Sequence, residues 1–254
     1  MLSGSFKMRD LGAAKYLLGI EIVRDRKKRT IALNQRQYID KVFARYGMTD
    51  CKPVFTPMAV GIHLTATDPE NDEVIHHMAL TNDGPIVSYQ SIVGSAMYAM
   101  LGTRADLAHA VGVLGRFSAS PKRIHWAAAK RLLRYLKGTR DWALHYEGAD
   151  IGMDMTFYGY SDANWNGDKD TSRSTSGYVF IANRGAIGWS SRRQSMVALS
   201  STESEYIGLA NAGQHLAWLR SFFDELGEAQ KDATELRCDN RAAIILSQDP
   251  QYRA

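Results

Sequence analysis

Three acidic residues in the second half of the chain have the types and positions that metal-dependent chemistry requires. Asp162 lies within a run of apolar and aromatic residues that is typical of a β-strand, and Asp239 ends a later strand-like run. Glu205 lies one turn into a long amphipathic stretch that indicates a helix. If the two strands are adjacent, the aspartates lie side by side, and a helix that crosses the sheet can present Glu205 to the same place.

A group of three carboxylates needs a cation. Carboxylates that share one place repel each other, which raises their pKa values unless positive charge is present. Mg²⁺ prefers oxygen ligands, and two such ions can activate a water molecule and stabilise the leaving oxygen in phosphodiester cleavage. Asp at a strand end and Glu in a first helical turn are also common caps, so spacing alone favours this structural role.

The pattern of the second half predicts the elements that would position these residues. The long helix is capped by Ser200 or Ser201 and ends at Gly227. Three meandering strands, a helix, a strand and a helix describe a mixed α/β sheet. The predicted strands are 155–165, 176–183, 186–191 and 234–238, and the predicted helices are 200–226 and 240–247.

The first half has a different pattern, which predicts an α+β part and a domain boundary near residues 148–151. An irregular connector rich in proline and polar residues is expected over 51–85. The predicted strands are 15–22 and 30–33, and the predicted helices are 35–46, 89–101, 104–117 and 125–137.

Basic residues are concentrated near the end of the first half. The stretch between Asp106 and Asp141 holds eight Lys or Arg residues and no Asp or Glu. The helix at 125–137 has Ser120 as its predicted N-cap, Pro121 at its start and an apolar stripe opposite its basic residues. This pattern indicates either a solvated helix face or a contact surface for a phosphate backbone. The predicted contact residues on this helix are Lys130, Arg131, Arg134 and Lys137.

Further basic residues flank the predicted strands of the second half. Arg192 and Arg193 follow the third strand within a polar stretch, and Arg173 precedes the second strand. The stretch is either an ordinary polar loop or a contact with the phosphates and 2′-hydroxyls that mark an RNA strand. Arg173 is placed where it could reach a phosphate.

Composition narrows the class of protein. The chain has 254 residues, 45% of them hydrophobic and 23% charged, with a formal net charge of +4. No stretch approaches the roughly 18 apolar residues of a membrane span, and the first residues lack the apolar core of a signal peptide. Two distant cysteines, Cys51 and Cys238, exclude a disulfide framework and a CxxC metal site. We therefore expect an intracellular protein without a membrane partner.

Several motifs, in order along nearly the whole chain, carry a family resemblance. They include Leu18-Gly19-Ile20-Glu21-Ile22, Val93-Gly94-Ser95-Ala96-Met97-Tyr98, Arg131-Leu132-Leu133-Arg134-Tyr135-Leu136-Lys137-Gly138-Thr139, Tyr160-Ser161-Asp162-Ala163-Asn164-Trp165 and Ala198-Leu199-Ser200-Ser201-Thr202-Glu203-Ser204-Glu205-Tyr206. By these motifs the chain closely resembles the C-terminal part of the Pol polyprotein of copia-type LTR retrotransposons.

The resemblance implies two modules. Residues 1–150 resemble the end of the reverse-transcriptase palm, the thumb and the connection region. Residues 152–254 resemble an RNase H domain, which has an RNase H-like mixed sheet and cuts the RNA strand of RNA–DNA hybrids with carboxylate-bound Mg²⁺ or Mn²⁺. The family implies a hybrid or duplex nucleic acid as partner, in the cytoplasm (as a virus-like particle) or the nucleus.

The resemblance also assigns roles to the three acids. Asp162 resembles the metal bridge on the first strand, and Asp239 resembles the ligand at a strand end. Two residues are candidates for the helix acid. Glu205 is favoured over Glu203 because the apolar and small residues that follow it, 206–209, fit the family's pattern.

Two departures from the family limit the expected activity. The polymerase signature Tyr-x-Asp-Asp does not occur, so this chain is not expected to synthesise DNA. The family's RNase H domain continues with one more strand and helix, which carry a fourth carboxylate. We therefore expect an incomplete RNase H-like domain, weak or absent hydrolysis, and an unprotected strand edge at 234–239 that favours dimerisation or aggregation.

Two other readings stay open from the sequence alone. The chain is alternatively a non-catalytic nucleic-acid-binding remnant of a Pol protein, or an interaction protein that a host has recruited. The oligomeric state does not follow from the sequence.

Overall fold

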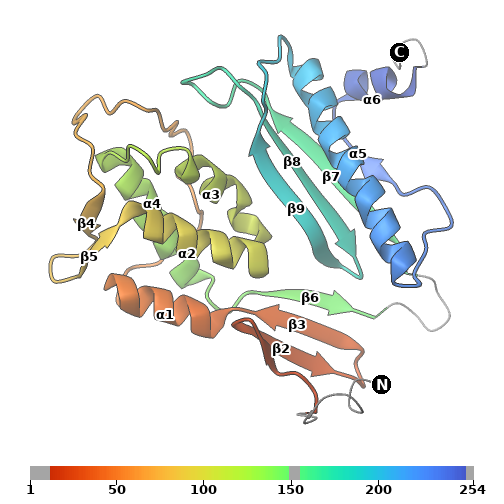
Figure 1. The fold of residues 1–254 in the computed structure, drawn as a ribbon, viewed down its shortest axis with the longest axis horizontal. Coiled ribbons are helices and arrows are strands. Elements are labelled where there is room, and N and C mark those ends of the chain that lie inside the picture. Colours follow the sequence, from red (N-terminus) through yellow and green to blue (C-terminus); the bar gives the residue numbers. More distant parts are fainter. Residues whose placement is uncertain (1–11, 149–154, 250–254) are drawn as a thin grey trace, which may run out of the picture.

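The chain forms two hydrophobic cores, each enclosed by its own helices and strands. The computed structural model describes residues 12–148 and 155–249 (Figure 1). The larger core consists of side chains between residues 39 and 136, and the smaller one of side chains between residues 157 and 236. The predicted mixed α/β fold is confirmed. The predicted boundary near 148–151 falls on a segment, 149–154, that lies outside the described residues.

An antiparallel sheet in the first half has the strand order β1-β2-β3-β6. β6 was not predicted, yet it pairs with every residue of β3. A separate hairpin of β4 and β5 lies in and beside the stretch that was predicted to be irregular. The strands are β1 (Tyr16–Leu17), β2 (Ile20–Asp25), β3 (Thr30–Asn34), β4 (His77–Ala79), β5 (Ile86–Ser88) and β6 (Ala143–Glu147).

Helices of the first half surround the larger core. Apolar side chains at helical spacing face inward, and Tyr46, Tyr89 and Trp126 are fully buried among them. The helices are α1 (Arg36–Tyr46), α2 (Tyr89–Gly102), the 3-10 turn η2 (Ala105–Leu107), α3 (Ala108–Gly115) and α4 (Arg123–Gly138).

The start of α4 differs from the prediction. The helix begins at Arg123 with Lys122 as its N-cap, and Ser120 does not cap it. The ring of His125 provides the reason, because its Nδ1 accepts the Lys122 N–H at 2.9 Å while its Nε2 lies 2.9 Å from the Thr65 carbonyl oxygen. A buried imidazole therefore satisfies the first backbone donor, which is the role that the sequence had suggested for a serine hydroxyl.

The sheet of the second half has the strand order β10-β7-β8-β9. β10 runs parallel to β7, and the other pairs are antiparallel. The first and fourth predicted strands are therefore adjacent, which is the condition for bringing the two aspartates together. Asn183 and Arg184 both have positive φ, as a tight turn between β8 and β9 requires. The strands are β7 (Phe157–Asn164), β8 (Thr175–Ala182), β9 (Gly185–Arg193) and β10 (Leu236–Arg237).

Helix α5 (Ser201–Glu225) covers one face of this sheet, and α6 (Arg241–Gln248) follows β10 (Figure 1). The Ser200 hydroxyl accepts the Glu203 N–H at 3.1 Å, so Ser200 is the N-cap. On the opposite face, α3 packs against β9. The side chains of Tyr160 and Asp162 on β7 remain exposed to solvent. Among the helices of the described ranges, none has the length and apolar character that crossing a membrane would need.

Candidate active site

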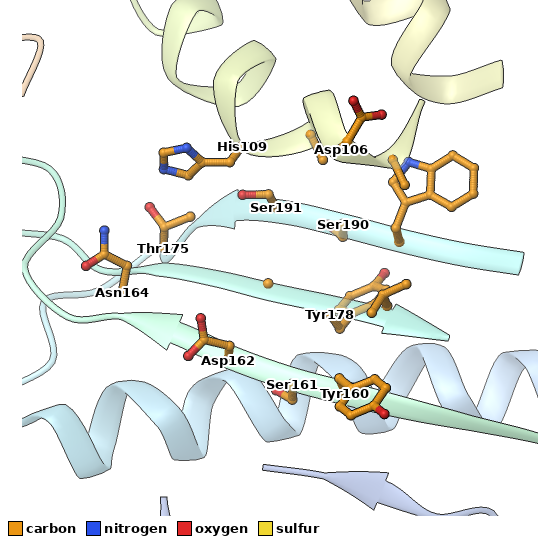
Figure 2. A pocket seen from close by; sticks show the side chains of 15 residues that line it. Asp106, His109, Tyr160, Ser161, Asp162, Asn164, Thr175, Tyr178, Ser190 and Ser191 are labelled. Carbon is orange, nitrogen blue, oxygen red and sulfur yellow. The ribbon is translucent and has the colours of Figure 1, made fainter. Parts of the chain in front are cut away.

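Two neighbouring strands position the aspartates. Asp162 lies near the end of β7, and Asp239 lies two residues after β10. The parallel register pairs Leu236 with Gly159 and Arg237 with Tyr160. Asp162 and Asp239 each follow the last pair of this register by two residues, so both lie at the same end of the paired strands. Both aspartates are exposed, and Figure 2 shows the Asp162 carboxylate on the sheet face turned toward α3.

Glu205 approaches from α5 and is 7% exposed. Its Oε2 lies 4.0 Å from the Cys238 Sγ. One potential ligand atom from each of Glu205, Cys238 and Asp239 lies within 4.8 Å of the others. Asp162 is outside that group of described residues, although it lies close enough for its charge to act on Glu205. The structure therefore brings Glu205 and Asp239 together, with Asp162 on the adjacent strand.

The electrostatics of this place disfavour additional negative charge. Burial raises the pKa of the Glu205 carboxyl, and the charges of Asp162 and Asp239 raise it further, while the Ala163 N–H partly offsets them. Burial likewise raises the pKa of the Cys238 thiol. Among the described residues, no Lys or Arg forms an ion pair with the three carboxylates. Carboxylate oxygens without a cationic partner suit a hard divalent ion such as Mg²⁺.

The two candidate helix acids have different environments. The Glu203 carboxylate accepts the Leu199 N–H at 2.6 Å, so it closes the N-terminus of α5. Glu205 instead faces the strands and Cys238. The geometry therefore agrees with the choice of Glu205 for the site, and its catalytic role stays a prediction.

A groove of about 400 Å³ lies between η2–α3 and the outer face of the second sheet. Asp162, Asn164 and Tyr160 line it from the sheet, and His109 lines it from α3 (Figure 2). Residues of the first half therefore contribute to the surroundings of Asp162. No motif links His109 to the second half, so its place beside Asp162 is not predictable from the sequence.

The basic residues of α4 do not form a bare cationic face. Lys130, Arg131, Arg134 and Lys137 are all half-buried. Arg131 donates to the Thr56 hydroxyl and Arg134 to the Lys52 carbonyl, each at 2.7 Å. The Lys137 ammonium lies 5.4 Å from the centroid of the Phe43 ring. Much of this helix thus holds the chain segment that follows α1.

Acidic residues that are distant in sequence neutralise part of the same basic run. Lys122 pairs with Asp72, and Arg140 pairs with Asp40 at 2.5 Å. No acidic residue occurs within this stretch of the sequence, but acidic side chains from other parts of the chain lie beside it in the fold. The positive charge on the surface is therefore smaller than the sequence of the stretch suggests.

The basic residues of the second half differ in availability. Arg192 is exposed and Arg173 is half-buried. Arg193 forms an ion pair with Asp168, a nearly buried carboxylate that Arg116 also approaches. Burial alone would raise the pKa of Asp168, but hydrogen bonds from Thr171 and Arg193 hold it below its usual range. Arg193 is therefore engaged within the protein, and Arg192 is the freer of the pair.

Comparison with known proteins places the chain in a family. Residues 1–60 match the family model described as reverse transcriptase (RNA-dependent DNA polymerase). The chain is 44% identical over 254 residues to the retrovirus-related Pol polyprotein from transposon TNT 1-94 of Nicotiana tabacum, which covers all of this chain and 18% of that protein. It is 36% identical over 253 residues to the retrovirus-related Pol polyprotein from transposon RE2 of Arabidopsis thaliana. That match covers 100% of this chain and 16% of the polyprotein.

A shorter relative matches about half of the chain. The secreted RxLR effector protein 161 of Plasmopara viticola is 50% identical over 133 residues, which is 52% of this chain and 92% of that protein. No solved structure matches the chain. The chain spans less than a fifth of the length of the two polyproteins. Because the first polyprotein matches along the entire chain, the protein belongs to the Pol family of copia-type retrotransposons.

Proposed function

We propose that residues 152–254 form an RNase H domain that cleaves the RNA strand of RNA–DNA hybrids with Mg²⁺ or Mn²⁺. The observation that carries this proposal is the meeting of Glu205 and Asp239 beside Asp162 at one edge of a mixed sheet. Residues 1–150 are proposed to be the end of the palm, the thumb and the connection region. The reverse-transcriptase match over residues 1–60 supports that assignment.

The three carboxylates of the site come from different elements of the fold. Asp162 and Asp239 are exposed at this edge of the sheet, where a strand of nucleic acid can lie, and Glu205 completes the site from α5. These three carboxylates would hold the divalent metal. When bound, the metal supplies an activated water and stabilises the leaving oxygen of the phosphodiester.

The proposal is tested with a hybrid whose RNA and DNA strands carry different labels. In Mg²⁺ or Mn²⁺ we expect the RNA strand to shorten and the DNA strand to stay intact, with no cleavage in EDTA. RNA and DNA duplexes of the same sequence serve as matched controls. Tight hybrid binding without any cleavage in either metal would contradict the enzymatic proposal and support a non-catalytic binding function.

Glu205→Gln is expected to lower hybrid cleavage by about 50-fold, because it removes one charge from the metal-binding set. Glu203→Gln is the matched control, since it lies on the same helix turn but caps the backbone. It should keep cleavage within about twofold and cost about 0.5–1 kcal/mol of stability. Initial cleavage rates and urea unfolding measure the two effects. Equal loss of activity in both variants would reject the choice of Glu205.

We also propose that α4 contributes to duplex binding through Lys130 and Lys137, with Arg131, Arg134, Arg173, Arg192 and Arg193 as further phosphate contacts. Arg131 and Arg134 bond to Thr56 and Lys52, whereas Lys130 and Lys137 form no ion pair with the described residues. The double variant Lys130→Gln/Lys137→Gln should flatten the slope of log affinity against log salt by about 1–2. Lys27→Gln/Lys28→Gln, which removes the same charge from an exposed turn, should leave the slope unchanged. An unchanged slope in the α4 variant would remove α4 from the binding surface.

A further inference from the structure

An arginine that the sequence analysis did not select lies next to the carboxylates on the exposed face of the second sheet. Arg237 is paired with Tyr160 in the parallel register of β10 and β7. Side chains two residues apart on a strand share a face, so Tyr160 shares its face of β7 with Asp162, about 7 Å further along. Asp239 follows Arg237 by two residues, just beyond the end of β10. All four residues are exposed.

The guanidinium of Arg237 is fixed in place by the aromatic side chains beneath it. Its central carbon lies 4.7 Å from the centroid of the Tyr158 ring and 5.4 Å from that of Tyr160. Its Nη1 donates to the Tyr160 hydroxyl at 3.0 Å, and its Nη2 pairs with Glu235 at 2.8 Å. Arginine stacked on aromatic rings loses little further freedom when it binds a ligand.

Donors remain for a ligand. The two hydrogen bonds use two of the five N–H groups of the guanidinium, and the side chain is 46% exposed. The partner Glu235 is 60% exposed, and a pair of that kind contributes little stability, so a phosphate can compete for the guanidinium. Arginine binds phosphate oxygens with two parallel N–H donors, which fixes both position and orientation.

We propose that Arg237, held by Tyr158 and Tyr160, forms a phosphodiester-binding subsite for the nucleic-acid strand that enters the carboxylate site. Contacts to phosphates set the register of a strand without reading its sequence. A fixed positive charge beside three carboxylates also offsets their repulsion of the incoming backbone. The identity of the bound strand as the one to be cut rests on the proposed function, whereas the phosphate contact itself does not.

The test measures binding and cleavage of an RNA–DNA hybrid separately. Binding is measured in EDTA over a range of salt concentrations, and cleavage is measured in Mg²⁺. Arg237→Gln should weaken binding about three- to tenfold and flatten the salt slope by about 0.9, as the loss of one phosphate contact requires. It should raise KM by a similar factor and change kcat by less than about twofold, because the contact positions substrate without touching the reacting atoms.

Two further variants separate positioning from general charge or folding effects. Arg241→Gln removes an exposed charge at the start of α6 and should leave affinity and salt slope as they are. Tyr160→Phe keeps the ring and the charge but removes the hydrogen bond, so it should weaken binding about two- to threefold at an unchanged slope. Unchanged binding in Arg237→Gln, or an equal loss in Arg241→Gln, would overturn the subsite. Absent cleavage by the unmodified protein would contradict only the proposed function.

Discussion

Asp162→Asn is expected to reduce hybrid cleavage by about 1,000-fold, which corresponds to about 4 kcal/mol of transition-state stabilisation. The change keeps the shape of the side chain and removes one negative charge from the proposed metal-binding set, on the strand that pairs with β10 and packs against α5. Because the side chain is exposed, folding stability should change by less than about 0.5 kcal/mol.

A matched control is Asp224→Asn, which removes the same charge from the exposed far end of α5. It should cleave like the unmodified protein. Initial rates under single-turnover conditions, with circular dichroism to confirm folding, measure the difference. Cleavage that persists in Asp162→Asn would reject the assigned chemistry for the entire site, including the roles of Glu205 and Asp239.

Arg104→Met should lower the free energy of unfolding by about 2–4 kcal/mol, the largest stability effect expected in the chain. Arg104 is 2% exposed and lies between η2 and the end of α4. Its Nη1 donates to the Thr139 carbonyl at 3.0 Å, and its Nε and Nη2 donate to Asp106 at 3.0 and 2.7 Å. Methionine fills similar space but donates no hydrogen bonds, so Asp106 loses its guanidinium partner and the Thr139 carbonyl keeps only the Trp142 N–H.

Urea unfolding measures the loss, and Arg24→Met on the exposed face of β2 is the control, with an expected change below about 0.5 kcal/mol. Arg104→Lys should be intermediate because it keeps the charge and loses the planar fork. A loss below about 1 kcal/mol in Arg104→Met would show that neighbouring groups or water replace the guanidinium. Since η2 leads directly into α3, this arginine also supports the helix that borders the groove at Asp162.

Local patterns predicted most of the helices and the second sheet. The run at 176–183 is rich in β-branched and aromatic residues and is followed by a tight turn, so both β8 and the hairpin to β9 were expected. β6 escaped prediction because five residues without strong flanking turns carry no local signal, and their partner β3 is distant in sequence. Sequence also cannot show that a buried histidine will cap α4.

Part of the candidate site was also predictable from local sequence patterns. Sequence patterns predicted Asp162 within one strand and Asp239 at the end of another. β10 pairs with β7 as that requires, but it ends at Arg237, two residues before Asp239. The sequence did not single out Cys238 or Arg237. Only the pairing of β10 with β7 shows which residues of this short segment lie near Glu205 and Tyr160. The basic run shows the opposite error, because Asp72 and Asp40 neutralise part of it from elsewhere in the chain.

β10 consists of two residues paired on one side to β7. So short a strand can detach from the sheet without unfolding of either hydrophobic core, which makes it a region of low local stability. Asp239 and Arg237 move with it. A metal ion or nucleic acid that binds at this edge of the sheet therefore stabilises the attached form of β10 by mass action. Slower amide hydrogen exchange at residues 235–239 would measure that binding directly.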